Sequence, residues 1–395
     1  MTVRPLWPAT PSESLRIMVW NEDQRALRAA IEELGDLLSK EHVERDAGAE
    51  FPVEGWARVR ETGLFGLPFD PAWGGLGQDL LTTMYVLEGL GYGCRDGGLS
   101  FSVSTHMVST GVPLQRFGSP ALKDRYLRRV CDGSVIGAHA ITEPEGGSDV
   151  MAMRTSAVLD GDAYVLNGAK SFVSNGPVAD VFVVYARTGR RGSPAAITAL
   201  LVDRDTPGLT VGRPVAKMGL RTSPLCELFF DDCRVPAANV VGSPGAGFLI
   251  MDHVMKWEIL CSFIINVGEM QHRLERCAGY ARTRTQFGRP IGAYQSIANK
   301  IVEMKIVTDT ARKWLYDTAA KLRDGENVTV DIAISKLLAS EGNVTSALAA
   351  VQVFGGYGYT AEYGLEKDLR NAVGGTIYSG TSDIQRQRIA SMIGL

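Results

Sequence analysis

Residues 247–263 read Gly-Phe-Leu-Ile-Met-Asp-His-Val-Met-Lys-Trp-Glu258-Ile-Leu-Cys-Ser-Phe, and no proline follows until Pro290. Apolar side chains recur at spacings of three and four residues from about Ala246 to Arg284, which predicts one long helix over that range. Most helical glutamates face solvent, but Glu258 lies among apolar neighbours. Because apolar surroundings raise the pKa of a carboxylate, such a position suits a general base that works near neutral pH.

The end of the same predicted helix carries a second group of polar residues. It reads Arg284-Thr-Gln-Phe287-Gly-Arg-Pro-Ile-Gly-Ala-Tyr-Gln295. Glu258 and Arg284 are 26 residues apart, which corresponds to roughly 39 Å along a continuous helix. Because that distance exceeds the size of one compact site, we expect one of the two groups to serve a neighbouring subunit.

The composition indicates a globular protein of two or three domains. The chain has 395 residues, of which 45% are hydrophobic and 22% charged, with a net charge of −3. This charge balance argues against a nucleic-acid partner. No signal peptide and no apolar run of 18 residues is present, so we expect a cytoplasmic protein with no membrane partner. The six cysteines and five histidines lack metal-ligand spacing, which predicts reduced thiols and no metal site.

Three segments of different periodicity follow one another. Helical patterns fill residues 20–135, and long amphipathic segments return over residues 243–395. Between them, over residues 136–242, short β-rich runs such as Val181–Tyr185 alternate with turn signals. Asp160-Gly161 and Asn167-Gly168 are typical of hairpin turns, so we expect a small antiparallel barrel or sandwich there. Residues 1–15 carry three prolines and are expected to form a loose tail.

Two short motifs in the β-rich segment combine polar and aromatic side chains. In residues 140–149, Thr142 and Ser148 place hydroxyls beside glycines, which suits a phosphate or a polar ring edge. In residues 170–176, Phe172 offers an aromatic wall and Ser174 a hydroxyl. An ordinary glycine-rich loop and an edge strand with a turn are the structural alternatives.

Three motifs of the helical C-terminal segment also suit a polar ligand. The guanidinium group of Arg284 is matched to a diphosphate. Gln352-Val-Phe-Gly355-Gly356 interrupts a helix with glycines, which lets a ligand or another backbone approach. Tyr378-Ser-Gly-Thr381-Ser-Asp383 is typical of a turn followed by a helix with Thr381 or Ser382 as its N-cap, a favourable place for an anion or polar group.

These motifs, in this order and spacing, resemble the acyl-CoA dehydrogenase family over roughly residues 25–395. The resemblance implies an α+β fold with an N-terminal helical domain (20–135), a central antiparallel β-barrel or sandwich (136–242) and a C-terminal four-helix bundle (243–395). It also implies bound FAD and a homo-oligomer, either a tetramer or a dimer. The residues expected to bind FAD from one subunit are His139, Ile141, Thr142, Gly147, Ser148, Phe172, Ser174, Thr381 and Asp383. Those expected from the neighbouring subunit are Arg284, Phe287, Gln295, Gln352, Gly355 and Gly356.

The resemblance also suggests where the base lies. Ser379 stands where many family members carry a catalytic glutamate, and a hydroxyl cannot serve as that base. A minority of members place the base on the long helix, and Glu258 resembles that position. We therefore expect Glu258 to be the catalytic base and Ser148 and Ser379 to contact substrate. Phe172 replaces the usual tryptophan beside the flavin.

Within the family, Lys256-Trp-Glu258, residues 230–236 and residues 378–383 most resemble the aminoacyl- and prolyl-carrier-protein dehydrogenases of natural-product biosynthesis. This implies α,β-dehydrogenation of a short, branched or aminoacyl thioester on a carrier protein or CoA, with electrons passing to a flavoprotein or oxygen. Three alternatives stay open: a flavin-dependent oxygenase or oxidase, a ring-closing enzyme without net oxidation, and a scaffold or nucleic-acid binder of the same fold.

Overall fold

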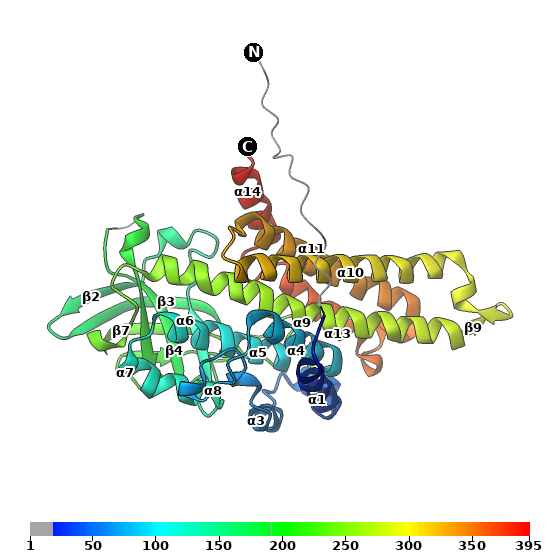
Figure 1. Ribbon diagram of the computed structural model, residues 1–395, viewed down its shortest axis with the longest axis horizontal. Coiled ribbons are helices and arrows are strands. Elements are labelled where there is room, and N and C mark those ends of the chain that lie inside the picture. The colour runs from blue at the N-terminus through cyan, green and yellow to red at the C-terminus, as the bar shows by residue number, and fades with distance from the viewer. Residues whose placement is uncertain (1–18, 191) are drawn as a thin grey trace, which may run out of the picture.

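The computed structural model describes residues 19–190 and 192–395. The tail predicted for residues 1–15 lies outside this range. An N-terminal group of helices, a central β-sheet and a C-terminal group of helices are held together by one long helix, α9 (Gly247–Thr283) (Figure 1). This arrangement confirms the predicted fold class. No helix in the described part of the chain has the length and apolarity needed to cross a membrane.

The N-terminal helices form one layer against α9. Within it, π-helical turns at Met107–Gly111 and Lys123–Leu127 link consecutive α-helices. The helices are α1 (Glu22–Leu38), α2 (His42–Gly48), α3 (Val53–Glu61), α4 (Leu80–Gly93), α5 (Gly97–His106), α6 (Val112–Phe117), α7 (Pro120–Leu122) and α8 (Arg128–Cys131).

Glycines allow α4 and α9 to pack at close range. A Cβ atom on Gly91 of α4 would lie 2.0 Å from the backbone oxygen of Ile265, and one on Gly268 of α9 would lie 2.1 Å from the backbone oxygen of Glu88. The two helices therefore touch backbone to backbone, which fixes the position of α9 along its length. Apolar residues of α9 such as Leu260 and Phe263 are fully buried in the core that the helices share.

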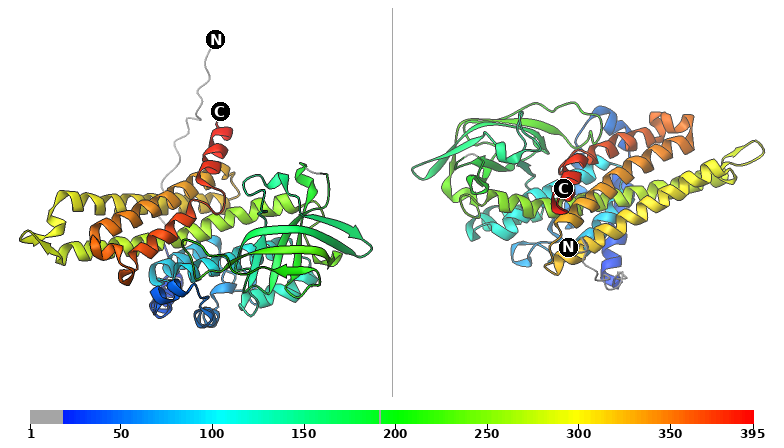
Figure 2. Two further views of the ribbon diagram at one scale, coloured as in Figure 1. Left: turned by 180° about the vertical axis from the view of Figure 1, so that it is seen from behind. Right: turned by 90° about the horizontal axis from the view of Figure 1, so that it is seen from above.

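The C-terminal helices continue from the far end of α9. A two-stranded hairpin, β9 (Thr285–Gln286) and β10 (Arg289–Pro290), projects from the end of α9 opposite the sheet (Figures 1 and 2). The remaining helices are α10 (Gln295–Arg323), α11 (Thr329–Phe354), α12 (Gly356–Tyr359), α13 (Leu365–Gly375) and α14 (Ser382–Met392). The last of these stands out from the body of the molecule.

The central sheet has the strand order β6-β7-β3-β2-β4-β5-β8, with β1 pairing with β4. Most pairs are antiparallel, as predicted, but β1 and β2 each run parallel to β4. The strands are β1 (Gly137–Ala140), β2 (Ser156–Asp160), β3 (Ala163–Ser174), β4 (Val181–Arg187), β5 (Ile197–Asp203), β6 (Leu209–Val211), β7 (Leu225–Pro236) and β8 (Val240–Val241).

The two faces of β4 belong to different cores. Phe182 and Val184 pack into the interior of the β domain. Val181, Val183 and Tyr185 belong to the core shared with α9 and the N-terminal helices. Because side chains alternate along a strand, this division means that every second residue of β4 points towards α9.

One predicted turn is wrong. Asp160 and Ala163 do flank a tight hairpin between β2 and β3, but Asn167-Gly168 lies inside β3, where the pairing with β7 shifts by one residue. The backbone of Gly168 has φ of 142° and passes so close to Thr155 that a Cβ atom would lie 2.7 Å from its Cα atom. A glycine bulge in a central strand therefore gave the same local signal as a hairpin turn.

Candidate active site

Glu258 and Ser379 meet at the junction between the long helix and the last loop. The Ser379 hydroxyl donates a hydrogen bond to Oε1 of Glu258 over 2.5 Å. The Glu258 side chain is only 12% exposed, and its neighbours Ile259 and Leu260 are fully buried. The two residues that we expected to contact substrate and to act as base are thus in direct contact, although 121 positions separate them.

The loop that carries Ser379 is held on both sides. Tyr378 stacks on Phe263 of α9, with ring centroids 5.2 Å apart, and burial raises the pKa of its phenol. Gln385 of α14 donates a hydrogen bond to the Ser379 carbonyl over 2.9 Å. Ser379 itself has φ of 54°, a left-handed conformation. A left-handed conformation is unfavourable for a serine, so the contacts of Tyr378 and Gln385 are needed to keep the Ser379 hydroxyl against Glu258.

His139 of β1 approaches Glu258 from the sheet. Its Nε2 atom lies 3.6 Å from Oε2 of Glu258, and its side chain is 17% exposed. The buried Nδ1 atom of His139 and Oε2 of Glu258 have no hydrogen-bond partner in the described structure. The structure therefore places His139, which we had expected only to line a cofactor, next to the predicted base Glu258.

A buried ion pair anchors the loop that follows β1. Lys170 donates hydrogen bonds to Oε1 of Glu143 over 2.8 Å and to the Ile141 carbonyl over 3.0 Å. Burial lowers the pKa of Lys170 to about 8. Burial alone would raise the pKa of Glu143, but the charge of Lys170 and the hydrogen bonds from Lys170, Thr155 and Arg154 together outweigh it and lower that pKa. The backbone N–H of Ser171 also donates to the Thr142 carbonyl over 2.9 Å, so the loop is fixed against β3.

The anchored loop and β3 present the predicted cofactor-lining residues together. Thr142 and Ser174 are half-buried, while Gly147 and Ser148 are exposed. Phe172 is 65% exposed and has φ of 56°, at a point where the β3–β7 register shifts between Lys170 and Val173. The motif lies on a central strand, which excludes the edge-strand interpretation.

The predicted neighbouring-subunit group lies at the other end of α9. α9 runs unbroken between the groups, so Arg284 is roughly 39 Å from Glu258 along the axis. Phe287 is 95% exposed, and the Arg284 guanidinium lies 5.8 Å from the centre of the Tyr357 ring. Every residue of the group is exposed in the single chain: Arg284, Phe287, Gln295, Gln352, Gly355 and Gly356. The structure thus places these residues at the end of the molecule where α9 finishes, far from the Glu258 site.

The start of α14 has the predicted N-cap. The Thr381 hydroxyl accepts a hydrogen bond from the backbone N–H of Ile384 over 3.2 Å, and Asp383 is exposed in the first turn. The hydroxyl of Thr381 is thus engaged in capping, whereas the Asp383 carboxylate faces outwards.

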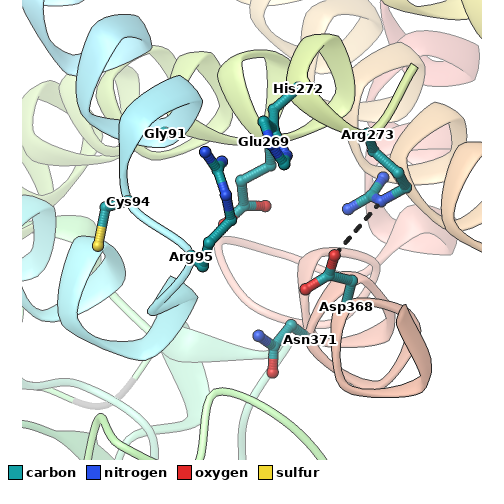
Figure 3. A pocket seen from close by; sticks show the side chains of 8 residues that line it. All are labelled: Gly91, Cys94, Arg95, Glu269, His272, Arg273, Asp368 and Asn371. Atoms are coloured by element: carbon teal, nitrogen blue, oxygen red, sulfur yellow. Dashed lines mark ion pairs between the residues drawn. The ribbon is translucent and has the colours of Figure 1, made fainter. Parts of the chain in front are cut away.

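A small cavity between α4, α9 and α13 lies apart from this site (Figure 3). Its space of about 10 Å³ suffices for no more than one water molecule. Asp368 lies 3.9 Å from Arg273 and accepts a hydrogen bond from Lys367 over 2.9 Å. Burial would raise the pKa of Asp368, but the positive charges of Lys367 and Arg273 outweigh it and lower that pKa to about 2. The charged residues that line this cavity form a structural network that joins the three helices.

Tyr185 of β4 is a site residue that the sequence did not reveal. Its hydroxyl is buried without a partner in the described structure, and its burial and the charge of Glu258 raise the pKa of the phenol. The only local signal was a polar group at the end of the apolar run Val181–Tyr185.

Comparison with known proteins identifies the family. Models of the acyl-CoA dehydrogenase N-terminal, middle and C-terminal domains match residues 21–134, 138–233 and 245–394. The chain belongs to the acyl-CoA dehydrogenase family.

Several relatives within the family act on carrier-bound substrates by name. An L-prolyl-peptidyl-carrier-protein dehydrogenase of Serratia is 39% identical over 91% of this chain and 93% of its own. Another from Pseudomonas fluorescens is 39% identical over 86% of this chain and 90% of its own. The solved structure of the prolyl acyl carrier protein oxidase AnaB has a TM-score of 0.93 at 39% identity, over 95% of this chain and 100% of its own. The FAD complex of PigA has a TM-score of 0.93 at 37% identity, over 96% and 99%.

Proposed function

We propose that this chain is an FAD-dependent dehydrogenase that introduces an α,β double bond into an aminoacyl group held as a thioester on a carrier protein. Short or branched acyl thioesters, on a carrier protein or CoA, form the wider substrate class. The carboxylate of Glu258, held by Ser379 at the junction of α9 and the last loop, carries the proposal. The relatives named for prolyl carrier proteins support the aminoacyl group and a role in secondary metabolism.

The two oxygens of Glu258 have different tasks in this proposal. Oε1 is engaged by the Ser379 hydroxyl, whereas Oε2 has no partner in the described structure. An α-proton beside a thioester is weakly acidic, and Oε2 is the free acceptor for it. The negative charge that develops on the thioester oxygen needs fixed donors, and we assign the backbone N–H of Ser379 to that role. Burial of Glu258 excludes water from the reacting atoms.

The residues around this site fit FAD. The exposed Phe172 ring and the hydroxyls of Thr142 and Ser148 are groups of the kind that a flavin and its ribityl chain require, and His139 carries a buried nitrogen that has no partner in the described structure. FAD, when bound, supplies the acceptor for the hydride that leaves the β-carbon. His139, Ile141, Thr142, Gly147, Ser148, Phe172, Ser174, Thr381 and Asp383 would hold it within one subunit.

The opposite end of α9 supports a homo-oligomer, either a tetramer or a dimer. Arg284, Phe287, Gln295, Gln352, Gly355 and Gly356 would hold the diphosphate and adenosine portions of the FAD in a neighbouring subunit. The 95% exposure of Phe287 is unusual for an aromatic side chain and supports a contact outside the single chain. The electron acceptor is a second flavoprotein or oxygen; the name oxidase of one solved relative supports oxygen. All six thiols are free, which supports a cytoplasmic location.

A substrate panel under anaerobic conditions tests the proposal. The purified oligomer is mixed with prolyl and other aminoacyl thioesters on a carrier protein and with butyryl-CoA, and flavin absorbance is followed. We expect the carrier-bound aminoacyl thioester to bleach the flavin and butyryl-CoA to do so slowly or not at all. Bleaching by no thioester, with oxygen-dependent oxidation after chemical reduction, would establish an oxygenase instead. A cyclised product without any flavin change would establish the ring-closing alternative.

A further inference from the structure

The sheet presents two polar side chains to the helix that carries Glu258. His139 of β1 is paired with Val183 of β4 in a parallel register, and Tyr185 follows two residues later. Paired residues and residues two apart share a face of the sheet. Val183 and Tyr185 belong to the core that includes Leu260 of α9. His139 and Tyr185 therefore point towards the same side of α9.

Three buried polar atoms on this side lack partners in the described structure. They are Oε2 of Glu258, Nδ1 of His139 and the Tyr185 hydroxyl. Buried polar atoms without partners are uncommon because each loses its hydrogen bonds to water. Three of them on neighbouring side chains indicate a group of residues arranged for function, since apolar residues of the same size would stabilise the core at lower cost.

We propose that His139 is a positioning residue for Glu258. Its Nε2–H group directs Oε2 of the carboxylate towards substrate, while Ser379 holds Oε1. The inference rests on the proposed function, in which Oε2 accepts the α-proton. The Nε2–Oε2 distance of 3.6 Å is about 0.7 Å longer than a hydrogen bond, so Nε2 lies beside Oε2 and leaves it free to accept a proton.

Tyr185 adds a third polar group on the same face of the sheet. A histidine that donates from Nε2 keeps an acceptor lone pair on Nδ1. Tyr185 is diagonal to His139 on the adjacent strand, with Cα atoms roughly 8 Å apart by strand geometry, and in the described structure its hydroxyl and Nδ1 of His139 are not hydrogen-bonded to each other. Because burial and the charge of Glu258 raise the pKa of Tyr185, its hydroxyl stays protonated and remains a donor.

The test isolates the proton-transfer step from the redox step. An acetyl thioester on a carrier protein has α-hydrogens but no β-hydrogen, so a base exchanges its α-hydrogens for deuterium in D2O without reducing the flavin. Exchange is followed by NMR for the FAD-loaded oligomer and for His139→Gln and His139→Met. Glutamine keeps an N–H donor near the position of Nε2, and methionine has similar length without a donor. His272→Met, a change on the distant half of α9, is the matched control.

We expect His139→Met to slow exchange at saturating thioester by between about ten- and a hundredfold, the loss typical of a misplaced catalytic group. His139→Gln should recover most of the wild-type rate, and the thioester concentration at half-saturation should stay unchanged in both. His272→Met should exchange like the wild type. A second variant without a donor, His139→Phe, replaces His139→Met if the latter fails to fold.

Equal exchange in the wild type and the methionine variant would overturn the positioning role while leaving Glu258 as the base. Equal losses in the methionine and glutamine variants would also overturn it, because the N–H group would then not matter. If the wild type neither exchanges acetyl thioesters nor is bleached by any aminoacyl thioester, the proposed function fails and the inference fails with it.

Discussion

Ser379 and Glu258, 121 positions apart in the chain, are joined by a hydrogen bond of 2.5 Å between the serine hydroxyl and one carboxylate oxygen. The loop before α14 and the first half of α9 thus form one site. The hydroxyl stands at a position where a side chain of another type could itself be the base, and here it contacts the carboxylate on a different helix that we propose as the base.

Replacing Ser379 with alanine should impair catalysis without removing the base. The hydroxyl fixes the position of the Glu258 carboxylate, and because a misplaced catalytic group typically costs about tenfold or more, we expect the rate of flavin reduction to fall by about that factor. FAD content should be unchanged, because this hydroxyl faces Glu258. Stopped-flow absorbance under anaerobic conditions measures the rate. An alanine variant as fast as the wild type would show that the hydrogen bond has no role in the reaction.

Arg284 should act in a neighbouring subunit, and subunit mixing tests this directly. Arg284→Gln and Glu258→Gln oligomers are each expected to be nearly inactive. Co-expressed with two different tags and purified through both, they should form mixed oligomers in which some sites combine an intact Glu258 with an intact Arg284 from the partner. In mixed dimers such sites make up about half of the total.

Recovery of activity in the mixed oligomers is the expected result. If Arg284 served the site of its own chain, every site would lack one of the two residues, and mixing would restore nothing. Each variant mixed with itself provides the control for the tagging and purification.

His106 should make the stability of the fold depend on pH. Its Nδ1 atom accepts a hydrogen bond from the Gly137 N–H at the start of β1, and its Nε2–H donates to the Val130 carbonyl. Burial lowers its pKa to about 4, although the bond to Val130 opposes the shift. The neutral ring is therefore favoured in the folded protein, and protonation of the unfolded chain below its ordinary pKa of about 6.5 costs stability.

The contribution of His106 is present in full above pH of about 6.5 and is lost as pH falls towards about 4, where the loss reaches about 3 kcal/mol. His106→Gln should be less stable at pH 7.5 but should lose less stability between pH 7.5 and pH 5. Urea unfolding of both proteins at the two pH values measures this. Equal losses would show that His106 does not titrate between the folded and unfolded states.

The elements governed by local pattern were predictable. The unbroken apolar repeat predicted α9 within a residue of Gly247–Thr283, and its length alone separated Glu258 from Arg284. The N-cap at Thr381 followed from a serine- and threonine-rich turn before a helical pattern. In each case a short stretch of sequence fixes the backbone, because helix length and capping depend on neighbouring residues.

The contacts that depend on the order of the strands in the sheet were not predictable. The parallel pairing of β1 with β4 places His139 and Tyr185 on one face, and nothing in either segment specifies the other as its partner. For the same reason the bulge at Gly168 resembled a turn, since the close approach of the Thr155 backbone, which leaves no room for a Cβ atom, cannot be read from the neighbouring residues. The approach of His139 to Glu258 depends on both the sheet order and the position of α9, which are properties of the whole fold.

The most direct test of the account compares the wild type with Glu258→Gln during anaerobic mixing with a carrier-bound aminoacyl thioester. The substitution keeps the shape of the side chain and removes its capacity to accept a proton. We predict that the wild type is bleached, while Glu258→Gln retains FAD and is bleached at least about a hundredfold more slowly. Bleaching of the variant at the wild-type rate would show that Glu258 is structural and that the base lies elsewhere.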